Sequence, residues 1–234
     1  MSKFTWFTGR GPALTQQQLQ RRQALSAPAP LDERPLHQQR IVVLDLETTG
    51  LNMRRDLVLA IGAVVIDHGA IDFAEQFECT LRRPDHQASA STLIHGIAPS
   101  EVARGVDPAE ALLDFMEFVG SSPLLAFHAG FDQRMLGRAL RQSLDYRLQH
   151  NFFDVAEIAP LLCPQARVRQ GGLDEWVAEF GLQVQQRHNA SADALVTAEL
   201  ALMLFSKARR QGIDSLCELE RQLASRRRRR QQAM

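Results

Sequence analysis

Two carboxylates that follow a buried strand are the residues of this sequence best placed to do chemistry. Residues 41–44 form an apolar run rich in β-branched side chains, and Asp45 and Glu47 come directly after it, two positions apart. The run predicts a strand buried on both faces, and alternation along it turns both carboxylates to the same side. Two like charges this close to an apolar core are unfavourable unless a cation lies between them. The pair therefore predicts a metal site.

Two further aspartates lie where α/β proteins commonly place functional groups. Asp132 follows a short apolar strand and begins a helix, and Asp193 lies in the first turns of the longest predicted helix. Four carboxylates without a cysteine or histidine cluster favour Mg²⁺ or Mn²⁺ over zinc. Taken singly, an aspartate at a strand end is more often a turn or cap residue. His128 and His188, taken singly, are more often structural or loop histidines. Spacing alone thus predicts a divalent-metal site and no more.

The elements that must position these groups follow from hydrophobic periodicity. Strands are predicted from residue 41 and at residues 57–66, 70–81, 124–127 and 152–154, and helices at residues 108–119, 133–142, 155–162, 173–180 and 188–208. The first three strands form an antiparallel meander, and strand–helix alternation follows. That order predicts a mixed α/β sheet with helices on both faces.

The chain is expected to divide into three parts. Residues 1–40 form an N-terminal extension, partly disordered or helical, and an Ala-Pro-Ala-Pro segment at residues 27–30 is a stiff linker within it. Residues 41–210 form the main domain, and residues 211–234 form a basic C-terminal tail.

Charge and cysteine content limit the classes of function. The formal net charge is zero, but removing the five consecutive arginines at residues 226–230 leaves 22 basic against 27 acidic side chains. A slightly acidic body argues against holding long duplex DNA by phosphate contacts alone. The arginine run is expected either to bind phosphates or an acidic partner, or to be a solvated tail.

The three cysteines, Cys79, Cys163 and Cys217, are odd in number and far apart, which favours free thiols and a cytoplasmic protein. The sequence shows no membrane span and no signal-peptide h-region.

Three motifs, in order along the chain, resemble those of the DEDDh 3′→5′ exonuclease superfamily. They are Asp45-Leu46-Glu47-Thr48-Thr49-Gly50, His128-Ala129-Gly130-Phe131-Asp132 and His188-Asn189-Ala190-Ser191-Ala192-Asp193. Further segments are similar to the proofreading, epsilon-type subunit of bacterial DNA polymerase III, namely Ile61-Gly62-Ala63, Ile94-His95-Gly96-Ile97 and Leu173-Asp174. The resemblance covers roughly residues 40–208. Ala129 departs from the asparagine usual in the family; because that position is not a metal ligand, the departure is expected to affect fine substrate positioning more than activity.

The resemblance implies a fold, a mechanism and a set of site residues. The fold would be a ribonuclease H-like mixed sheet. Asp45, Glu47, Asp132 and Asp193 would hold two Mg²⁺ or Mn²⁺ ions about 4 Å apart that clamp the attacking and leaving oxygens of the scissile phosphate. His188 would be the general base, a role that suits a side chain titrating near neutral pH. The residues implied in substrate contact are Leu46, Thr48, Thr49, His95 and His128.

Three hypotheses about function follow. The first is a 3′→5′ exonuclease acting on single-stranded or frayed DNA, in repair or in replication proofreading. The second is an RNA-trimming or oligoribonuclease-type enzyme, since no residue here reveals reading of the 2′-hydroxyl. The third is an accessory subunit that mainly binds a polymerase or repair assembly. Because no clamp-binding motif is recognised, we favour a stand-alone or differently partnered nuclease. The oligomeric state is not predicted.

Overall fold

The computed structural model describes residues 13–88, 90–168, 171–184 and 188–232 as one mixed sheet with helices around it. The strands are β1 (Ile41–Thr48), β2 (Val58–Asp67), β3 (Ala70–Thr80), β4 (Leu124–Ala126) and β5 (Phe152–Asp154). The helices are α1 (Gln16–Ala24), the short 3₁₀ helix η1 (Leu36–Gln38), α2 (Ala90–His95), α3 (Pro99–Arg104), α4 (Pro108–Val119), α5 (Ala129–Leu144), α6 (Val155–Leu162), α7 (Leu173–Glu179), α8 (Ala190–Arg210) and α9 (Leu216–Gln232).

The sheet has the strand order β3-β2-β1-β4-β5. β1, β2 and β3 pair antiparallel as a meander, whereas β4 pairs parallel to β1, and β5 parallel to β4. The mixed sheet predicted from the sequence is therefore confirmed, with β1 at its centre.

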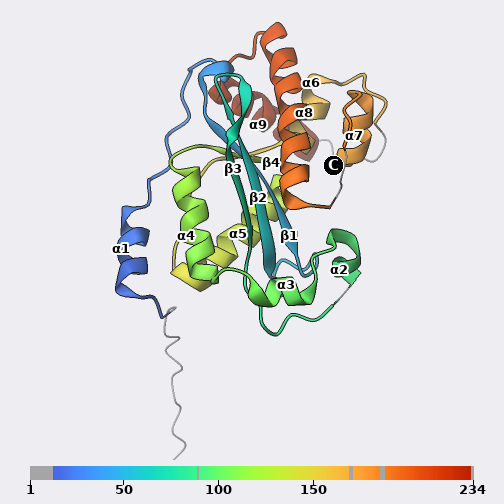
Figure 1. Ribbon diagram of the computed structural model, residues 1–234. Helices are drawn as coiled ribbons and strands as arrows, with labels where there is room; N and C mark the ends of the chain where they lie inside the picture. Colours follow the sequence, from blue (N-terminus) through green and yellow to red (C-terminus); the bar gives the residue numbers. More distant parts are fainter. Residues whose placement is uncertain (1–12, 89, 169–170, 185–187, 233–234) are drawn as a thin grey trace, which may run out of the picture.

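Helices cover both faces of the sheet (Figure 1), and the alternation of β1 decides which residue meets which layer. Val42, Leu44 and Leu46 pack into the cluster formed with α4 and α5. Ile41 and Val43 pack into the opposite cluster, which contains residues of α6, α7, α8 and α9. Asp45 and Glu47 continue the second series, so they face the side of the sheet that α8 covers.

The segment predicted as an N-terminal extension is partly helical and docks on the body. Thr15 and Gln18 form a capping box at the start of α1. The guanidinium of Arg21 contacts three carboxylates of α4, those of Glu110, Asp114 and Glu117, at 2.5–2.7 Å. Residues 1–12, which belong to the same predicted segment, lie outside the described residues.

The segment predicted as a basic tail contains α9. Leu216, Leu219 and Leu223 lie one above another on one face of this helix and are at most 1% exposed. They bury α9 against the body, in the cluster that contains α6 and α8. The arginine run is therefore held on a docked helix as far as Arg230.

The sequence pattern predicts no helix or strand between residues 81 and 108, whereas the structure forms α2 and α3 there. Both helices are only six residues long, too short for a periodic pattern to reveal them. Within the described part of the chain, no helix has the length and apolarity that crossing a membrane requires.

Candidate metal centre

Asp45 and Asp193 meet because a glycine lets α8 approach the sheet closely. Asp45 pairs with Gly62 across the antiparallel β1–β2 ladder. A Cβ atom on Gly62 would lie 2.2 Å from both the main-chain carbon of Ala190 and the nitrogen of Ser191. Only a residue without a side chain therefore allows the first turn of α8 to rest on β2. Asp193, in that turn, is thereby brought over Asp45.

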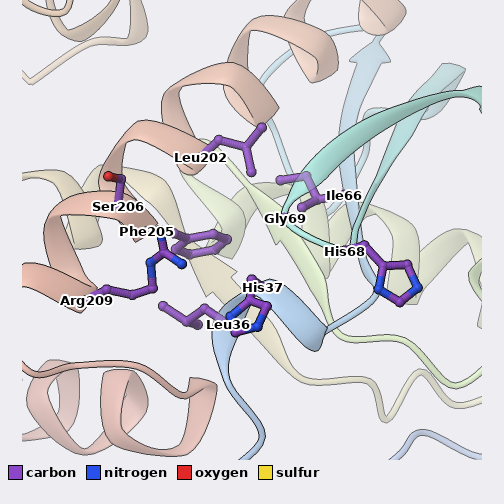
Figure 2. Close-up of a pocket in the computed structure, with 9 residues that line it drawn as sticks. All are labelled: Leu36, His37, Ile66, His68, Gly69, Leu202, Phe205, Ser206 and Arg209. Carbon is purple, nitrogen blue, oxygen red and sulfur yellow. The ribbon is translucent and has the colours of Figure 1, made fainter.

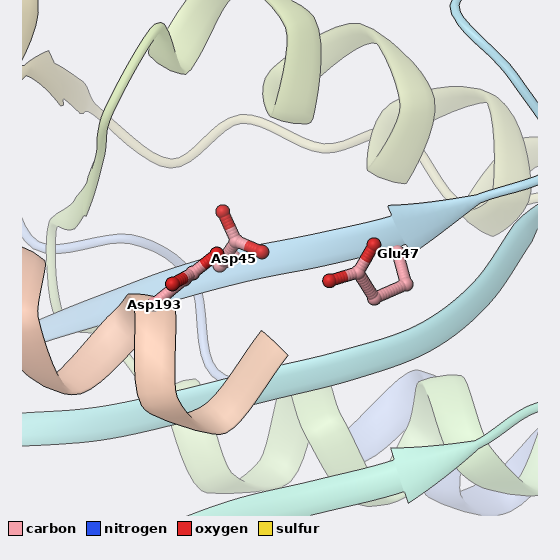
Figure 3. Close-up of side chains that lie close together, drawn as sticks. All are labelled: Asp45, Glu47 and Asp193. Atoms are coloured by element: carbon pink, nitrogen blue, oxygen red, sulfur yellow. The ribbon is translucent and has the colours of Figure 1, made fainter. Parts of the chain in front are cut away.

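Three carboxylates form the centre of the site (Figure 3). One oxygen from each of Asp45, Glu47 and Asp193 lies within 4.8 Å of the others. Asp193 is buried, at 6% exposure, whereas Asp45 and Glu47 are half-buried. All three offer hard oxygen ligands, and like charges at this separation oppose one another unless a cation neutralises them. The arrangement fits a divalent cation.

Asp132, the fourth predicted ligand, lies outside this group of three. It occupies the first turn of α5 and is 4% exposed. Burial raises the pKa of its carboxyl well above the usual range, and the charges of Asp154 and Glu47 raise it further. A hydrogen bond from the main-chain N–H of Leu46 acts in the opposite direction. Asp132 is thus close enough to Glu47 to feel its charge, and a cation between them would favour its ionised form.

Asp154 is a residue of the site that no sequence motif singled out. Its Oδ1 accepts hydrogen bonds from the main-chain N–H groups of His128 and Ala156, both at 2.9 Å. Burial, above all, raises the pKa of the Asp154 carboxyl. His128 has a left-handed backbone, with φ of 60°, at the N-cap of α5, so the bond to Asp154 fixes the turn that starts this helix. The sequence did offer one signal for Asp154, because it is the last residue of the strand predicted at residues 152–154.

His188 is held to the centre by its main chain. Its N–H donates to Oδ2 of Asp193 at 3.1 Å, and its φ is 60°, a strained value for a non-glycine residue. The imidazole is exposed. The turn therefore presents the side chain to solvent beside the carboxylates.

The predicted substrate-contacting residues lie at the end of β1 and around it. The hydroxyl of Thr48 donates to the Gly50 carbonyl at 2.8 Å, and that of Thr49 donates to Asp56 at 3.0 Å. Both side chains are used within the loop, and the N–H of Thr49 donates to the Leu57 carbonyl at 2.9 Å. His128 is exposed, and its ring meets that of Phe127 edge-on at 4.8 Å.

Helix α2 carries His95 and is tied to this same loop, because Ser91 Oγ donates to the Thr49 carbonyl at 2.9 Å. His95 is 8% exposed; its Nδ1 accepts from the Ile97 N–H at 3.1 Å, which leaves the proton on Nε2. That nitrogen is buried and has no partner within the described chain. Burial lowers the pKa of His95, and the charge of His86 lowers it further. The exposed side chains of Leu51 and Leu93 lie on these two segments.

A separate hollow of about 330 Å³ lies between the far end of α8, η1 and the β2–β3 turn (Figure 2). Phe205 on its wall is roughly 18 Å from Asp193 along α8, at 1.5 Å per residue. Neither an aspartate nor a glutamate is among its described lining residues. It is therefore distinct from the carboxylate centre.

The family model for exonucleases of the RNase T type matches residues 42–201, a range that contains every carboxylate of the centre. The chain belongs to this exonuclease family. The enzyme class and the superfamily expected from the three motifs are confirmed.

Known relatives include much longer polymerases. The chain is 32% identical over 180 residues to the PolC-type DNA polymerase III of Thermotoga petrophila, covering 76% of this chain and 13% of the polymerase. It is 29% identical over 189 residues to the same type of polymerase from Bacillus subtilis, covering 80% of this chain and 13% of that protein. The chain thus spans about an eighth of the length of these relatives.

Solved structures agree on the fold. E. coli exonuclease I in complex with a dT13 oligonucleotide has a TM-score of 0.63 at 18% identity, over 74% of this chain and 42% of that one. The cell-death related nuclease 4 (CRN-4) has a TM-score of 0.64 at 12% identity, over 72% of this chain and 64% of that one. The ribonuclease H-like fold implied by the sequence is confirmed.

Proposed function

We propose that this protein is a metal-dependent 3′→5′ exonuclease that removes nucleoside monophosphates from the 3′ end of single-stranded or frayed DNA. The observation that carries the proposal is the group formed by Asp45, Glu47 and Asp193. In a member of an exonuclease family, a carboxylate cluster at the central strand supports phosphodiester hydrolysis. The preference for single-stranded DNA draws on the oligonucleotide complex of E. coli exonuclease I.

Asp45, Glu47, Asp193 and Asp132 are the residues that would hold two Mg²⁺ or Mn²⁺ ions. Such ions polarise the scissile phosphate and lower the pKa of bound water. Carboxylates suit these hard cations, and the group of three has no sulfur ligand that would favour a softer metal.

The roles of the other residues follow from their positions. The imidazole of His188, exposed beside Asp193, would take a proton from the attacking water as general base. The main chain around Leu46, Thr48 and Thr49 would receive the terminal nucleotide. Leu51 and Leu93, exposed on neighbouring segments, offer apolar surface to its base.

The direct test uses oligonucleotides of one sequence as DNA and as RNA, labelled at the 5′ end. With Mg²⁺ or Mn²⁺ the protein is expected to shorten the DNA from its 3′ end, and Asp45→Asn should be inactive. Faster shortening of the RNA would favour the RNA-trimming alternative, which no described residue of the site excludes.

Intact substrates together with retained binding would overturn the proposal and favour an accessory role beside a polymerase or repair enzyme. The PolC-type relatives make a polymerase partner a reasonable one to test.

Substitution of His188 tests the assignment of the base. His188→Ala is expected to lower turnover by about 10²-fold or more, while the affinity for single-stranded DNA changes little. Oligonucleotide binding measured in EDTA and turnover measured in Mn²⁺ separate the two quantities. An unchanged turnover would remove His188 from the mechanism.

A further inference from the structure

The arginines at the end of α9 continue a stripe that is otherwise apolar. Leu216, Leu219 and Leu223 hold the helix on the body, and one turn later the same face carries Arg226 and Arg227. Both arginines are half-buried. A buried stripe that changes from leucine to arginine brings the cations against the protein instead of leaving them in solvent.

One of these arginines is neutralised locally, and its neighbours are not. Arg227 donates through Nε to Glu157 at 2.8 Å and through Nη1 to Glu220 at 3.1 Å. Arg226 and Arg229 form no ion pair with any described residue. Burial lowers the pKa of Arg226, the charges of Arg230 and Arg229 lower it further, and the charge of Glu157 raises it. Arg226 therefore has cationic neighbours and no ion-pair partner among the described residues.

The two unpaired arginines line a cavity of about 440 Å³. Its other walls come from α6, the segment after it, and α7, and they are Pro160, Leu161, Cys163, Pro164, Ala166, Val168 and Trp176. No aspartate or glutamate is among these described lining residues. Trp176 is 2% exposed, and its indole N–H has no hydrogen-bond partner in the described chain. The cavity thus combines two cations with apolar walls, as a site for an anion with an apolar portion would.

The cavity lies within two turns of α6 from Asp154. Helix α6 begins directly after Asp154, whose charge acts on Asp132. Pro160, on the cavity wall, is roughly 9 Å further along α6, at 1.5 Å per residue. Arg227 donates a hydrogen bond to Glu157, which lies on α6 between Asp154 and Pro160.

We propose that Arg226 and Arg229, with the cavity walls from residues 160–168 and Trp176, form a second binding site that takes a backbone phosphate of the single strand whose 3′ end enters the carboxylate centre. The inference rests on the proposed function. Arginine pairs well with phosphate oxygens, and the apolar walls suit a base or sugar beside that phosphate. We favour a nucleic-acid strand over an acidic protein partner because Arg227 ties the end of α9 to Glu157, one turn of α6 from Asp154. Without the arginine run the chain carries more acidic than basic side chains, so a nucleic-acid strand needs local cations to offset repulsion from its phosphates.

The test compares two double variants of equal charge in the same helix. Arg226→Gln with Arg229→Gln removes the cavity cations, of which Arg226 is half-buried and Arg229 exposed, whereas the control variant, Arg228→Gln with Arg230→Gln, removes two exposed arginines that do not line the cavity. Glutamine keeps helix propensity, and thermal unfolding checks that both variants fold. The probe is a twenty-nucleotide oligothymidylate labelled at its 5′ end, and its binding is followed by fluorescence anisotropy in EDTA over a range of salt concentrations.

The cavity variant (Arg226→Gln with Arg229→Gln) is expected to bind the oligonucleotide at least about five-fold more weakly than the control variant (Arg228→Gln with Arg230→Gln). The slope of log affinity against log salt should decrease by about 0.7 for each phosphate that the variant no longer neutralises. Equal effects of the two double variants, or no effect of the cavity variant, would overturn the proposal. If an acidic peptide competes with the oligonucleotide only when Arg226 and Arg229 are present, and the salt slope is unchanged, the occupant is a protein and the proposal fails.

Hydrolysis of the p-nitrophenyl ester of thymidine 5′-monophosphate separates this inference from the proposed function. The ester has no upstream phosphate and therefore reports on the carboxylate centre alone. If the two double variants differ in oligonucleotide binding as expected but the wild-type protein hydrolyses neither substrate, the exonuclease proposal fails and the arginines bind a single strand without serving that centre. If it hydrolyses both, and the cavity variant leaves the ratio of the two KM values unchanged, the phosphate site fails and the exonuclease stands.

Discussion

At the scale of single residues, the site is a concentration of negative charge that the metal-free protein must tolerate. The motifs identified Asp45, Glu47 and Asp193, and the structure brings them together. They also identified Asp132, but not that burial makes this carboxyl hard to ionise. That property depends on what β1 and β5 place around it, namely Glu47 and Asp154, of which no motif contains Asp154.

The raised pKa of Asp132 predicts how the stability of the metal-free protein varies with pH. Its folded-state pKa lies above the ordinary aspartate value of about 3.9, so the folded state binds the proton more tightly. This contribution to stability is complete below the ordinary pKa and is lost as the pH rises through the raised one. Asp132→Asn keeps an acceptor for the Leu46 N–H and has no charge to bury. In EDTA, its Tm should therefore exceed that of wild type at pH 8, by about 2–4 °C per kcal/mol relieved, and the gap should narrow toward pH 4. A gap that is constant across this range would show that Asp132 is not the group responsible.

At the scale of elements, the centre depends on how closely α8 approaches β2. Both elements could be predicted from the sequence, and Gly62 lies within a family-like segment. Their contact could not be predicted, because the pairing of Asp45 with Gly62 depends on strand register and the position of Ala190 on the glycine depends on tertiary packing. Helices α2 and α3 were missed because they are short and are held by tertiary contacts, such as that of Ser91 with Thr49.

Gly62→Ala is expected to separate the aspartates without removing a carboxylate. The new methyl group would meet main-chain atoms of α8 at 2.2 Å, so the first turn must move and carry Asp193 away from Asp45. Overpacking of this kind costs about 1–3 kcal/mol in unfolding free energy. Exonuclease turnover, measured on a 5′-labelled oligonucleotide, should fall by about 10²-fold, since a displacement near 1 Å can cost that much.

Gly137→Ala is the matched control for that substitution. Gly137 lies within α5, and a Cβ atom there would meet only the side chain of Leu148, which follows the helix, at 3.9 Å. It should leave turnover unchanged and stabilise the fold by about 0.4–1 kcal/mol. Full activity in Gly62→Ala would mean that the close approach of α8 is not what assembles the site.

At the scale of the whole molecule, both ends of the described chain are fastened to the domain. α1 is held on α4 by Arg21, and α9 is held by its leucines and by Arg227. The first attachment could not be foreseen from the sequence, because the partners of Arg21 lie about 90 positions away along the chain. Composition did reveal the arginine run, but only the packing of α9 shows which of its members turn toward the body.

Arg21→Ala is expected to lower the stability of the full chain modestly. The guanidinium is 23% exposed and meets three carboxylates, a network worth about 1 kcal/mol after solvent screening. Tm should fall by about 2–4 °C at low salt and by less at high salt. Arg34→Ala, which removes only a local pair with Asp32, is the control and should change little. A larger loss for Arg34 than for Arg21 would contradict the docking of α1.

Whether Asp45, Glu47 and Asp193 together hold a divalent cation can be measured by Mn²⁺ binding. Titration followed by electron paramagnetic resonance compares wild type with Asp193→Asn and with Glu199→Gln, a charge-matched change on the same helix outside the group. Wild type and Glu199→Gln are expected to bind Mn²⁺ alike, and the affinity of Asp193→Asn should be at least about 10-fold weaker. Equal Mn²⁺ affinity in all three proteins would contradict a metal site formed by these carboxylates.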